Sequence, residues 1–274
     1  MCRPITARQQ HKININYTAF QFIYWMMNCA IYSFAALFLL YQHFNNRNIG
    51  WLLAIANFVS IILQPAISQQ IIRRFRISVK HSILGMTLLL IAFLLPTCFM
   101  KLSTASMFVL YSLAAIIILT LQPFVNSLAF QYIHLGYKIN FGVSRGSGSL
   151  SYAITSYSLG WILAKFTPNA LPLIVIILAI AFMIPLLFLP KEGHSENNDQ
   201  DKKQKKGSSL SEAFKKYPFV PVLFLAFSFL FIFHTIISTS ITQILNSYGG
   251  GSQDVGTALM IAGLCELPAM FGFN

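Results

Sequence analysis

The sequence carries little charge, and acidic residues are the scarcest of all. Only 9% of the 274 residues are charged, and just seven residues are Asp or Glu. Residues 1–190 contain no acidic residue. Soluble domains place charges on about a quarter of their residues, so this composition excludes an ordinary soluble domain. The 56% of hydrophobic residues and the mean hydropathy of +0.65 instead indicate an integral membrane protein.

The chain also lacks the patterns of metal sites and of common enzymes. Its four cysteines, Cys2, Cys29, Cys98 and Cys265, have no CxxC or metal-ligand spacing. No HExxH motif is present. We therefore expect no metal, no cofactor and no enzymatic activity.

The net charge of +12 could indicate a nucleic-acid-binding protein. However, Lys and Arg lie in the gaps between apolar runs and do not cluster in one soluble segment. Loop topology explains this distribution better, so the expected partner is the lipid bilayer and not nucleic acid.

Apolar runs long enough to cross a bilayer as helices recur along the chain. The expected spans are residues 17–41, 50–72, 79–100, 105–130, 143–164, 170–190, 217–243 and 255–274. The first run is too long for a signal-peptide core, so we interpret it as a membrane helix. The pattern predicts an all-α, multi-pass protein with six helices in residues 1–190, a polar Lys-rich linker in 191–216, and two helices in 217–274.

The basic residues predict the orientation of these spans. With the N-terminus inside, the outside loops hold only Arg47, Lys101 and Lys165, and almost all other Lys and Arg lie inside. This asymmetry requires the polar fifth run to be counted as a span. We therefore expect a protein of the cell membrane whose N-terminus and linker are cytoplasmic.

The fifth run contains a charged residue among small and polar ones. On a helix, Arg145, Ser149, Tyr152 and Ser156 share one face, and Gly142 and Gly146 form a GxxxG pair suited to helix packing. A charge within a span costs at least about 2.5–3.5 kcal/mol and should face the bundle interior. The alternative is that Arg145 extends back to the cytoplasmic surface.

Three further polar residues in spans are candidates for a site. Glu266 is the one carboxylate within a span, beside the small residues Ala262 and Gly263, and Arg145 is its best cationic partner. The pair either holds helices together or forms a ligand or proton site. His234 either binds a ligand or proton or is hydrogen-bonded to a nearby helix, and Asn126 is a weaker candidate.

Several segments together resemble a known family. They are "NFGVSRGSGSLSYAITSYSLGWI", "IILQPAIS", "LQPFVNSLAFQY" and "GGGSQDVGTALMIAGLCEL". In this order they resemble lactose-permease-like members of the major facilitator superfamily, the group of oligosaccharide and nucleoside:proton symporters. The Phe-Gly-x-x-Arg-x-x-Gly element and the late glutamate are the most specific features.

The resemblance implies a fold of two facing six-helix bundles and a function in secondary active transport. A small organic solute (a sugar, nucleoside or aromatic compound) would move together with protons by alternating access. Arg145 and Glu266 would contact the solute, and Tyr152 would stack on it where the lactose permease has a tryptophan. The resemblance also implies a C-terminally truncated chain, so the alternative is a non-transporting membrane fragment.

The sequence departs from the family pattern at three places. Asn126 or Ser127 falls where an acidic residue of the fourth helix is expected, and His234 falls near an acidic position of the seventh. The loop "SQQIIRRFRISVK" keeps its basic residues but lacks the aspartate of the family. These differences argue against lactose as the solute.

Overall fold

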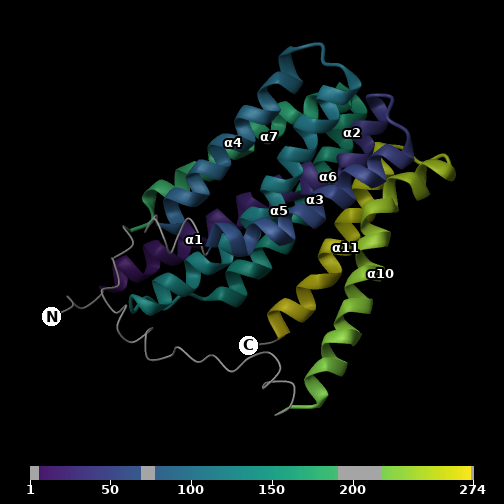
Figure 1. The fold of residues 1–274 in the computed structure, drawn as a ribbon. Coiled ribbons are helices and arrows are strands. Elements are labelled where there is room, and N and C mark those ends of the chain that lie inside the picture. Colours follow the sequence, from purple (N-terminus) through teal and green to yellow (C-terminus); the bar gives the residue numbers. More distant parts are fainter. Residues whose placement is uncertain (1–5, 69–77, 191–216, 273–274) are drawn as a thin grey trace. The chain divides into compact units, whose positions relative to one another are not determined.

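The protein is helical wherever its structure is described. The computed structural model describes residues 6–68, 78–190 and 217–272, and these residues form helices and no strands (Figure 1). The expected all-α fold is thus confirmed. The elements are α1 (Ala7–Asn28), the π-helical turn η1 (Cys29–Ser33), α2 (Ala35–Tyr41), α3 (Asn46–Ala66), α4 (Val79–Phe99), α5 (Thr104–His134), α6 (Phe141–Phe166), the 3-10 turn η3 (Pro168–Ala170), α7 (Leu171–Phe188), α10 (Phe219–Ser247) and α11 (Ser252–Gly272).

Apart from the first, each expected span coincides with a helix to within a few residues where its ends are described, and the end of the 50–72 span lies outside the described residues. The first expected span, 17–41, is covered by α1, η1 and α2 together. In the part of the chain that the structure describes, five helices are long and apolar enough to cross a membrane: α3, α4, α5, η3 with α7, and α10. A sixth span results if the bent pair of Ala7–Ser33 and Ala35–Tyr41 is counted as one. The helices α6 and α11 form as expected, but they are not among the helices that pass this test of length and composition.

Side-chain caps explain where several helices begin. Thr6 and Gln9 form a capping box at the start of α1. The side chains of Asn45, Ser103 and Asn140 accept hydrogen bonds from the first-turn amides of α3, α5 and α6. The polar caps of α3, α5 and α6 interrupt the apolar runs, and these helices start within a few residues of the expected spans. By contrast, α1 begins ten residues before the expected start at residue 17.

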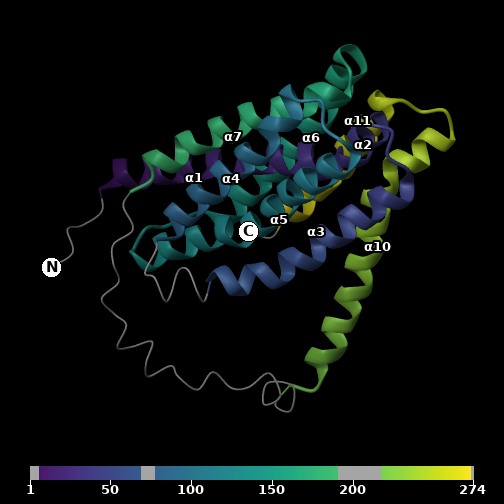
Figure 2. The same cartoon turned by 45° about the horizontal axis from the view of Figure 1, so that its top comes forward.

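Residues 1–192 and 241–274 form one compact unit, and residues 193–240 form a second. In the first unit, α1 packs against α6 and α7, whereas α3 and α4 pack against α5. Successive helices run in opposite directions, so the α2–α3 and α6–α7 connections lie at one end and the α5–α6 connection lies at the other (Figures 1 and 2). The predicted boundaries at residues 190 and 216 stay predictions, and the linker lies outside the described residues.

Buried tyrosines join the helices of the first unit. The hydroxyl groups of Tyr17 and Tyr24 on α1 donate to carbonyl oxygens of α5, and the hydroxyl of Tyr111 on α5 donates to the carbonyl oxygen of Ile31 in η1. A buried hydroxyl requires such a partner, because water cannot reach it. These bonds fix α1 against α5 and thereby orient the opposite face of α1 toward α6.

The end of α7 is held by its neighbours. The ammonium group of Lys80 on α4 donates to the carbonyl oxygens of Leu187 and Leu189, and the hydroxyl of Tyr132 on α5 donates to that of Pro190. The last carbonyl groups of a helix lack partners within the helix, and a cation there is favoured by the helix dipole. The chain therefore leaves α7 at a fixed position.

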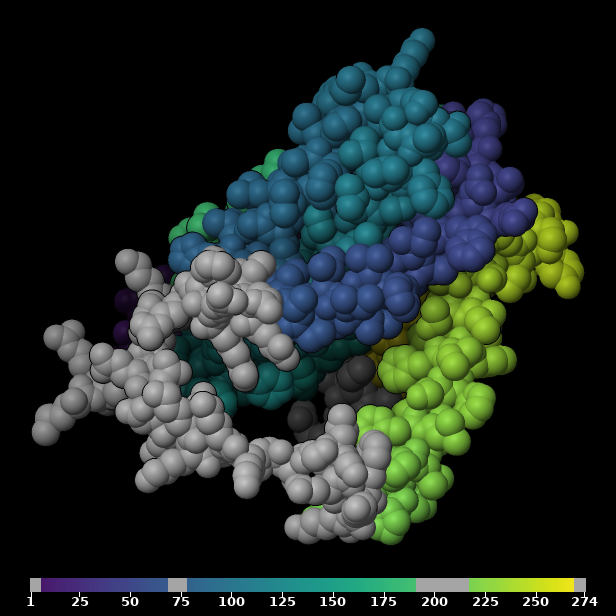
Figure 3. Space-filling model, in the orientation of Figure 1, coloured from purple at the N-terminus to yellow at the C-terminus, as the bar shows by residue number. Residues whose placement is uncertain are grey.

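The outward face of α3 is apolar. In the space-filling view, α3 covers much of the face turned toward the reader (Figure 3). Its side chains Trp51, Phe58 and Ile61 are exposed, with Phe58 at 67%. Such large exposed apolar surfaces are unfavourable in water but suit contact with lipid chains.

The second unit includes the first part of α10. The side chains from Val222 to Ile237 are exposed and almost entirely apolar, with His234 and Ser228 among the few polar exceptions. The helix has a mean hydropathy of 2.4 over its most apolar window, which fits a membrane span.

Candidate functional site

The polar helix α6 is held between α1 and α11. It runs antiparallel to α11, and the two backbones touch where Gly160 faces Gly256. A Cβ atom on Gly256 would lie 2.5 Å from the carbonyl oxygen of Ser156 and 2.8 Å from the Cα atom of Gly160. Only glycine permits this approach. Gly146 of the expected GxxxG pair is buried, but the contact between α6 and α11 is made at Gly160 and Gly256.

Arg145 and Glu266 are brought together through a serine. The Nη1 atom of Arg145 donates to Ser149 Oγ at 3.2 Å, and Ser149 Oγ donates to Glu266 Oε2 at 2.9 Å. In the part of the chain that the structure describes, no direct ion pair joins Arg145 to Glu266. The expected proximity of the two charges is found, but a buried hydroxyl separates them, because Ser149 lies one turn beyond Arg145 on the same face of α6.

The direction of the Arg145 side chain distinguishes an interior position from the alternative, in which the side chain extends back to the cytoplasmic surface. Its guanidinium bonds to Ser149, one turn further into α6, and its Cζ atom lies 4.1 Å from the centre of the Trp25 ring on α1. A side chain extending to the membrane surface would point toward the start of α6 instead. The half-buried guanidinium thus lies among side chains of α1 and α6.

Trp25 was not among the residues expected in the site. Its indole lies directly on the backbone of Gly148, where a Cβ atom would come within 2.4 Å of Trp25 Cδ1 and 2.9 Å of Nε1. Tyr24 meets it edge-on, at a centroid distance of 5.6 Å. Only a weak pattern in the sequence points to Trp25 as a site residue: it follows Gln21 by one helical turn, on the side of α1 that carries polar residues.

Glu266 is more exposed than expected. The small residues beside it suggested an interior position, but its side chain is exposed apart from the bond to Ser149. The reason is that α11 packs on α6 along one side, and Ala262 and Cys265 are exposed as well. One carboxylate oxygen is thus bound by α6, and the carboxylate remains accessible.

Tyr152 lies beside Glu266, but its hydroxyl is already bonded. The hydroxyl is 2.8 Å from Ser33 Oγ in η1, which ties α6 to the π-helical turn. Its ring packs on Gly263, where a Cβ atom would lie 3.2 Å from Tyr152 Cδ1. Gly263 precedes Glu266 by nearly one turn, so the ring and the carboxylate lie on the same part of α11. Sequence reasoning missed Ser33, since nothing in the sequence marks the π-helical turn.

Asn126 belongs to a different group of side chains. Its Oδ1 atom accepts from Gln21 Nε2 at 3.0 Å, and the same Nε2 atom donates to the hydroxyl of Tyr17 at 2.8 Å. Among the contacts found in residues 6–68, 78–190 and 217–272, none joins Asn126 to Arg145 or Glu266. Gln21 is fully buried, and its Oε1 atom has no protein hydrogen-bond partner.

His234 lies on α10, in the second unit. Its Nδ1 atom is 3.3 Å from Ser238 Oγ, one turn further along the same helix. This bond is within α10 and not to a nearby helix, as the alternative expected. The assignment of His234 to a solute or proton site stays a prediction. No group of three or more His, Cys, Asp or Glu side chains in the described residues could hold a metal ion.

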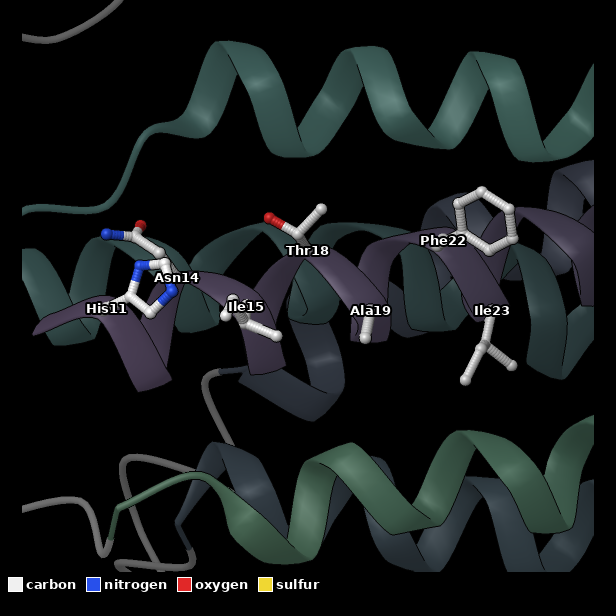
Figure 4. A pocket seen from close by; sticks show the side chains of 7 residues that line it. All are labelled: His11, Asn14, Ile15, Thr18, Ala19, Phe22 and Ile23. Atoms are coloured by element: carbon white, nitrogen blue, oxygen red, sulfur yellow. The ribbon is translucent and has the colours of Figure 1, made fainter. Parts of the chain in front are cut away.

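A groove of about 550 Å³ lies apart from these residues. It is lined along one side of α1 by His11, Asn14, Ile15, Thr18, Ala19, Phe22 and Ile23 (Figure 4). Asn14 bonds to the α5–α6 connection at Lys138 and Asn140, and the hydroxyl of Thr18 is 2.9 Å from Ser144 Oγ. The polar members of the lining are therefore partly used to fix α1 to α6.

Comparison with curated proteins and with solved structures finds no match for this chain. A comparison with protein families does find one: residues 14–274 match the MFS_1-like family. The match spans nearly the whole chain and agrees with the multi-pass helical fold. It confirms the resemblance to the major facilitator superfamily, whereas the lactose-permease-like subgroup stays a prediction. The chain therefore belongs to the MFS_1-like family, within the major facilitator superfamily of membrane transporters.

Proposed function

We propose that this protein transports a small hydroxylated organic solute, a sugar or a nucleoside, together with protons. Arg145 and Glu266 would bind the solute, with the ring of Tyr152 beside them. The observation that carries the proposal is the arrangement of Arg145, Ser149 and Glu266, in which one hydroxyl accepts from a guanidinium and donates to a carboxylate.

A solute hydroxyl has the same hydrogen-bonding capacity as the hydroxyl of Ser149. It can accept from Arg145 while donating to Glu266, so it can replace or supplement the serine between the two charges. Hydrogen bonds to charged groups are stronger than those between neutral groups, and this pairing favours a polyhydroxy compound over an apolar one. The ring of Tyr152 adds an apolar face against which a sugar or base can pack.

Proton coupling and topology belong to the same proposal. Among the described residues, Glu266 is the one acidic residue in the middle of a helix. Its carboxylate is accessible, so it can take up a proton. Residues 1–190 would form the first helical bundle, 191–216 a cytoplasmic linker, and 217–274 the first helices of the second bundle. The alternating helix directions and the excess of Lys and Arg at the N-terminal side support this orientation in the cell membrane.

Uptake measurements test the proposal directly. The protein, expressed from its complete natural coding sequence, would be reconstituted in liposomes and supplied with labelled sugars and nucleosides under an imposed pH gradient. We expect accumulation that disappears when the gradient is collapsed. Arg145→Ala and Glu266→Gln should each abolish accumulation, because each removes one of the two partners of the solute hydroxyl.

The matched controls lie on the same two helices. Lys165→Ala removes a cation at the far end of α6, and Asp254→Asn removes a carboxylate in the first turn of α11, and both should retain accumulation. Undiminished accumulation by Arg145→Ala and Glu266→Gln would refute the site. Accumulation that persists after collapse of the pH gradient would refute proton coupling.

A further inference from the structure

Among residues 6–68, 78–190 and 217–272, no carboxylate makes direct contact with Arg145, as one normally would with a cation in a membrane helix. Residues 1–190 supply no carboxylate, and Glu266 reaches Arg145 only through Ser149. An intramembrane arginine is costly unless another group compensates its charge. The group found against the guanidinium is the indole of Trp25, with the Cζ atom of Arg145 4.1 Å from the ring centre. This distance lies well inside the limit of about 6 Å for a cation–π interaction, and tryptophan is the most favourable ring.

The indole is itself fixed in place. On one side it lies against the α6 backbone at Gly148, where any Cβ atom would collide with it. Tyr24 meets its edge at an interplanar angle of 82°, and the Tyr24 hydroxyl donates to the carbonyl oxygen of Ile118 on α5. Trp25 is therefore held by the α6 backbone and by Tyr24, which is itself bonded to α5.

We infer that Trp25 is the residue that positions Arg145 for solute binding, in the role that a carboxylate would otherwise fill. This inference rests on the proposed function. The indole compensates the positive charge through its π-face and so leaves the N–H groups of the guanidinium unoccupied. A bidentate carboxylate would occupy two of the five N–H donors.

The hydrogen bonding of Arg145 agrees with this role. Among the residues that the structure describes, its guanidinium makes one hydrogen bond, to Ser149. The remaining donors are available to a solute, while the Cζ atom lies against the ring of Trp25. Trp25 is thus a positioning residue: it acts on the solute through Arg145.

Transport kinetics of Trp25 variants test the inference. Trp25→Phe keeps a π-face, whereas Trp25→Leu keeps only an apolar side chain. We expect Trp25→Leu to raise KM for the solute about tenfold while kcat changes less than about threefold, and Trp25→Phe to stay within about threefold of the wild type in both. A wild-type KM for Trp25→Leu would overturn the inference. So would a Trp25→Phe variant as impaired as Trp25→Leu at equal amounts of inserted protein, since packing alone would then explain the effect.

A spectroscopic measurement tests the contact without transport. The chain has three tryptophans, and Trp51→Phe with Trp161→Phe leaves Trp25 as the sole indole. In this background, Arg145→Met should change the emission maximum and intensity of Trp25, while Lys165→Met should not. An unchanged spectrum with Arg145→Met would overturn the inference. If the wild type moves no sugar or nucleoside, the proposed function fails, and the emission measurement still decides whether Trp25 holds Arg145.

Discussion

Ser149 is the residue through which the charges of α6 and α11 meet. Its side chain is only 2% exposed, and its hydroxyl group is both an acceptor for Arg145 and a donor to Glu266. An alanine in its place would leave two charged groups facing each other without the atom that connects them. Hydrogen bonds to charged groups are costly to lose when one partner stays behind.

We expect Ser149→Ala to lower the free energy of unfolding by about 1 kcal/mol. Two charge-assisted hydrogen bonds are lost, but water can partly replace them because Glu266 is exposed and Arg145 is half-buried. Thermal unfolding of the purified protein in detergent measures the change. Ser147→Ala is the matched control, since the hydroxyl of Ser147 bonds to the backbone of its own helix, at the carbonyl oxygen of Ser144. Equal effects of the two substitutions would contradict a bridging role for Ser149.

Gly148 is the second residue whose identity the site requires. Gly148→Ala would place a Cβ atom 2.4 Å from Trp25 Cδ1, so the indole must move away. Such overpacking typically costs about 1–3 kcal/mol, and we expect a loss of stability in this range. Gly85→Ala, on α4 with nothing within 4 Å of the added atom, should instead be neutral or stabilising. Thermal unfolding of both variants measures the two changes in stability. A Gly148→Ala variant as stable as Gly85→Ala would disprove the contact between Gly148 and Trp25.

At the scale of single residues, the sequence predicts part of the site. The helical period of 3.6 residues places Arg145, Ser149 and Tyr152 on one face, and the scarcity of acids directs attention to Glu266. Trp25 could not be predicted, because it reaches Arg145 across an interface between α1 and α6. No local pattern encodes which helices become neighbours.

The contact between α6 and α11 is the clearest feature at the scale of elements. Gly160 and Gly256 let the two backbones touch, and this contact sets the register in which Ser149 faces Glu266. Membrane helices without a hydrophobic force between them depend on such small residues for close packing. The site therefore depends on a glycine pair located well away from it along both helices.

We expect Gly256→Ala to force α6 and α11 apart, since its Cβ atom would lie 2.5 Å from the carbonyl oxygen of Ser156. The expected cost is about 1–3 kcal/mol of unfolding free energy, together with a large loss of solute accumulation. Thermal unfolding and uptake measure the two effects. Gly251→Ala, in the turn before α11 with open space around it, is the control. Full uptake by Gly256→Ala would show that the close contact is dispensable.

The bend in the first span shows what the sequence does not encode locally. Residues 17–41 predict a single helix, but the chain bends by 43° after η1. This segment contains no proline, and the bend occurs at a π-helical turn, which is a known cause of kinks. Tyr152 bonds to Ser33 and Tyr111 bonds to Ile31 in this turn, so its shape depends on contacts with α5 and α6.

At the scale of the whole molecule, the distribution of charge predicts how the chain lies in the membrane. Cysteine labelling tests this orientation in a variant whose four cysteines are replaced by serine. We expect Lys101→Cys, between α4 and α5, to react with an impermeant maleimide in intact cells, because few cations lie on that side. Leu135→Cys, between α5 and α6, should react only after permeabilisation. The opposite pattern would refute the predicted topology.

The positions of the helices were largely predictable, because long apolar runs and polar caps are properties of the sequence itself. The division into compact units depends instead on which helices pack together, and residues 241–274 join residues 1–192 in one such unit. Asn126 shows the same limit. The resemblance places Asn126 or Ser127 where an acidic residue of the fourth helix is expected, whereas in the structure Asn126 bonds to Gln21 on α1.

The fit of Trp25 on Gly148 has a consequence for the evolution of this family. An indole at one position and a missing side chain at the other are useful only together, so the two sites should change as a pair. Relatives with a larger residue at the position of Gly148 should have lost the tryptophan. In those relatives, a carboxylate elsewhere should compensate the charge of the arginine. A substitution history with this pattern would show that an aromatic ring and an acidic residue are interchangeable solutions to the same electrostatic problem.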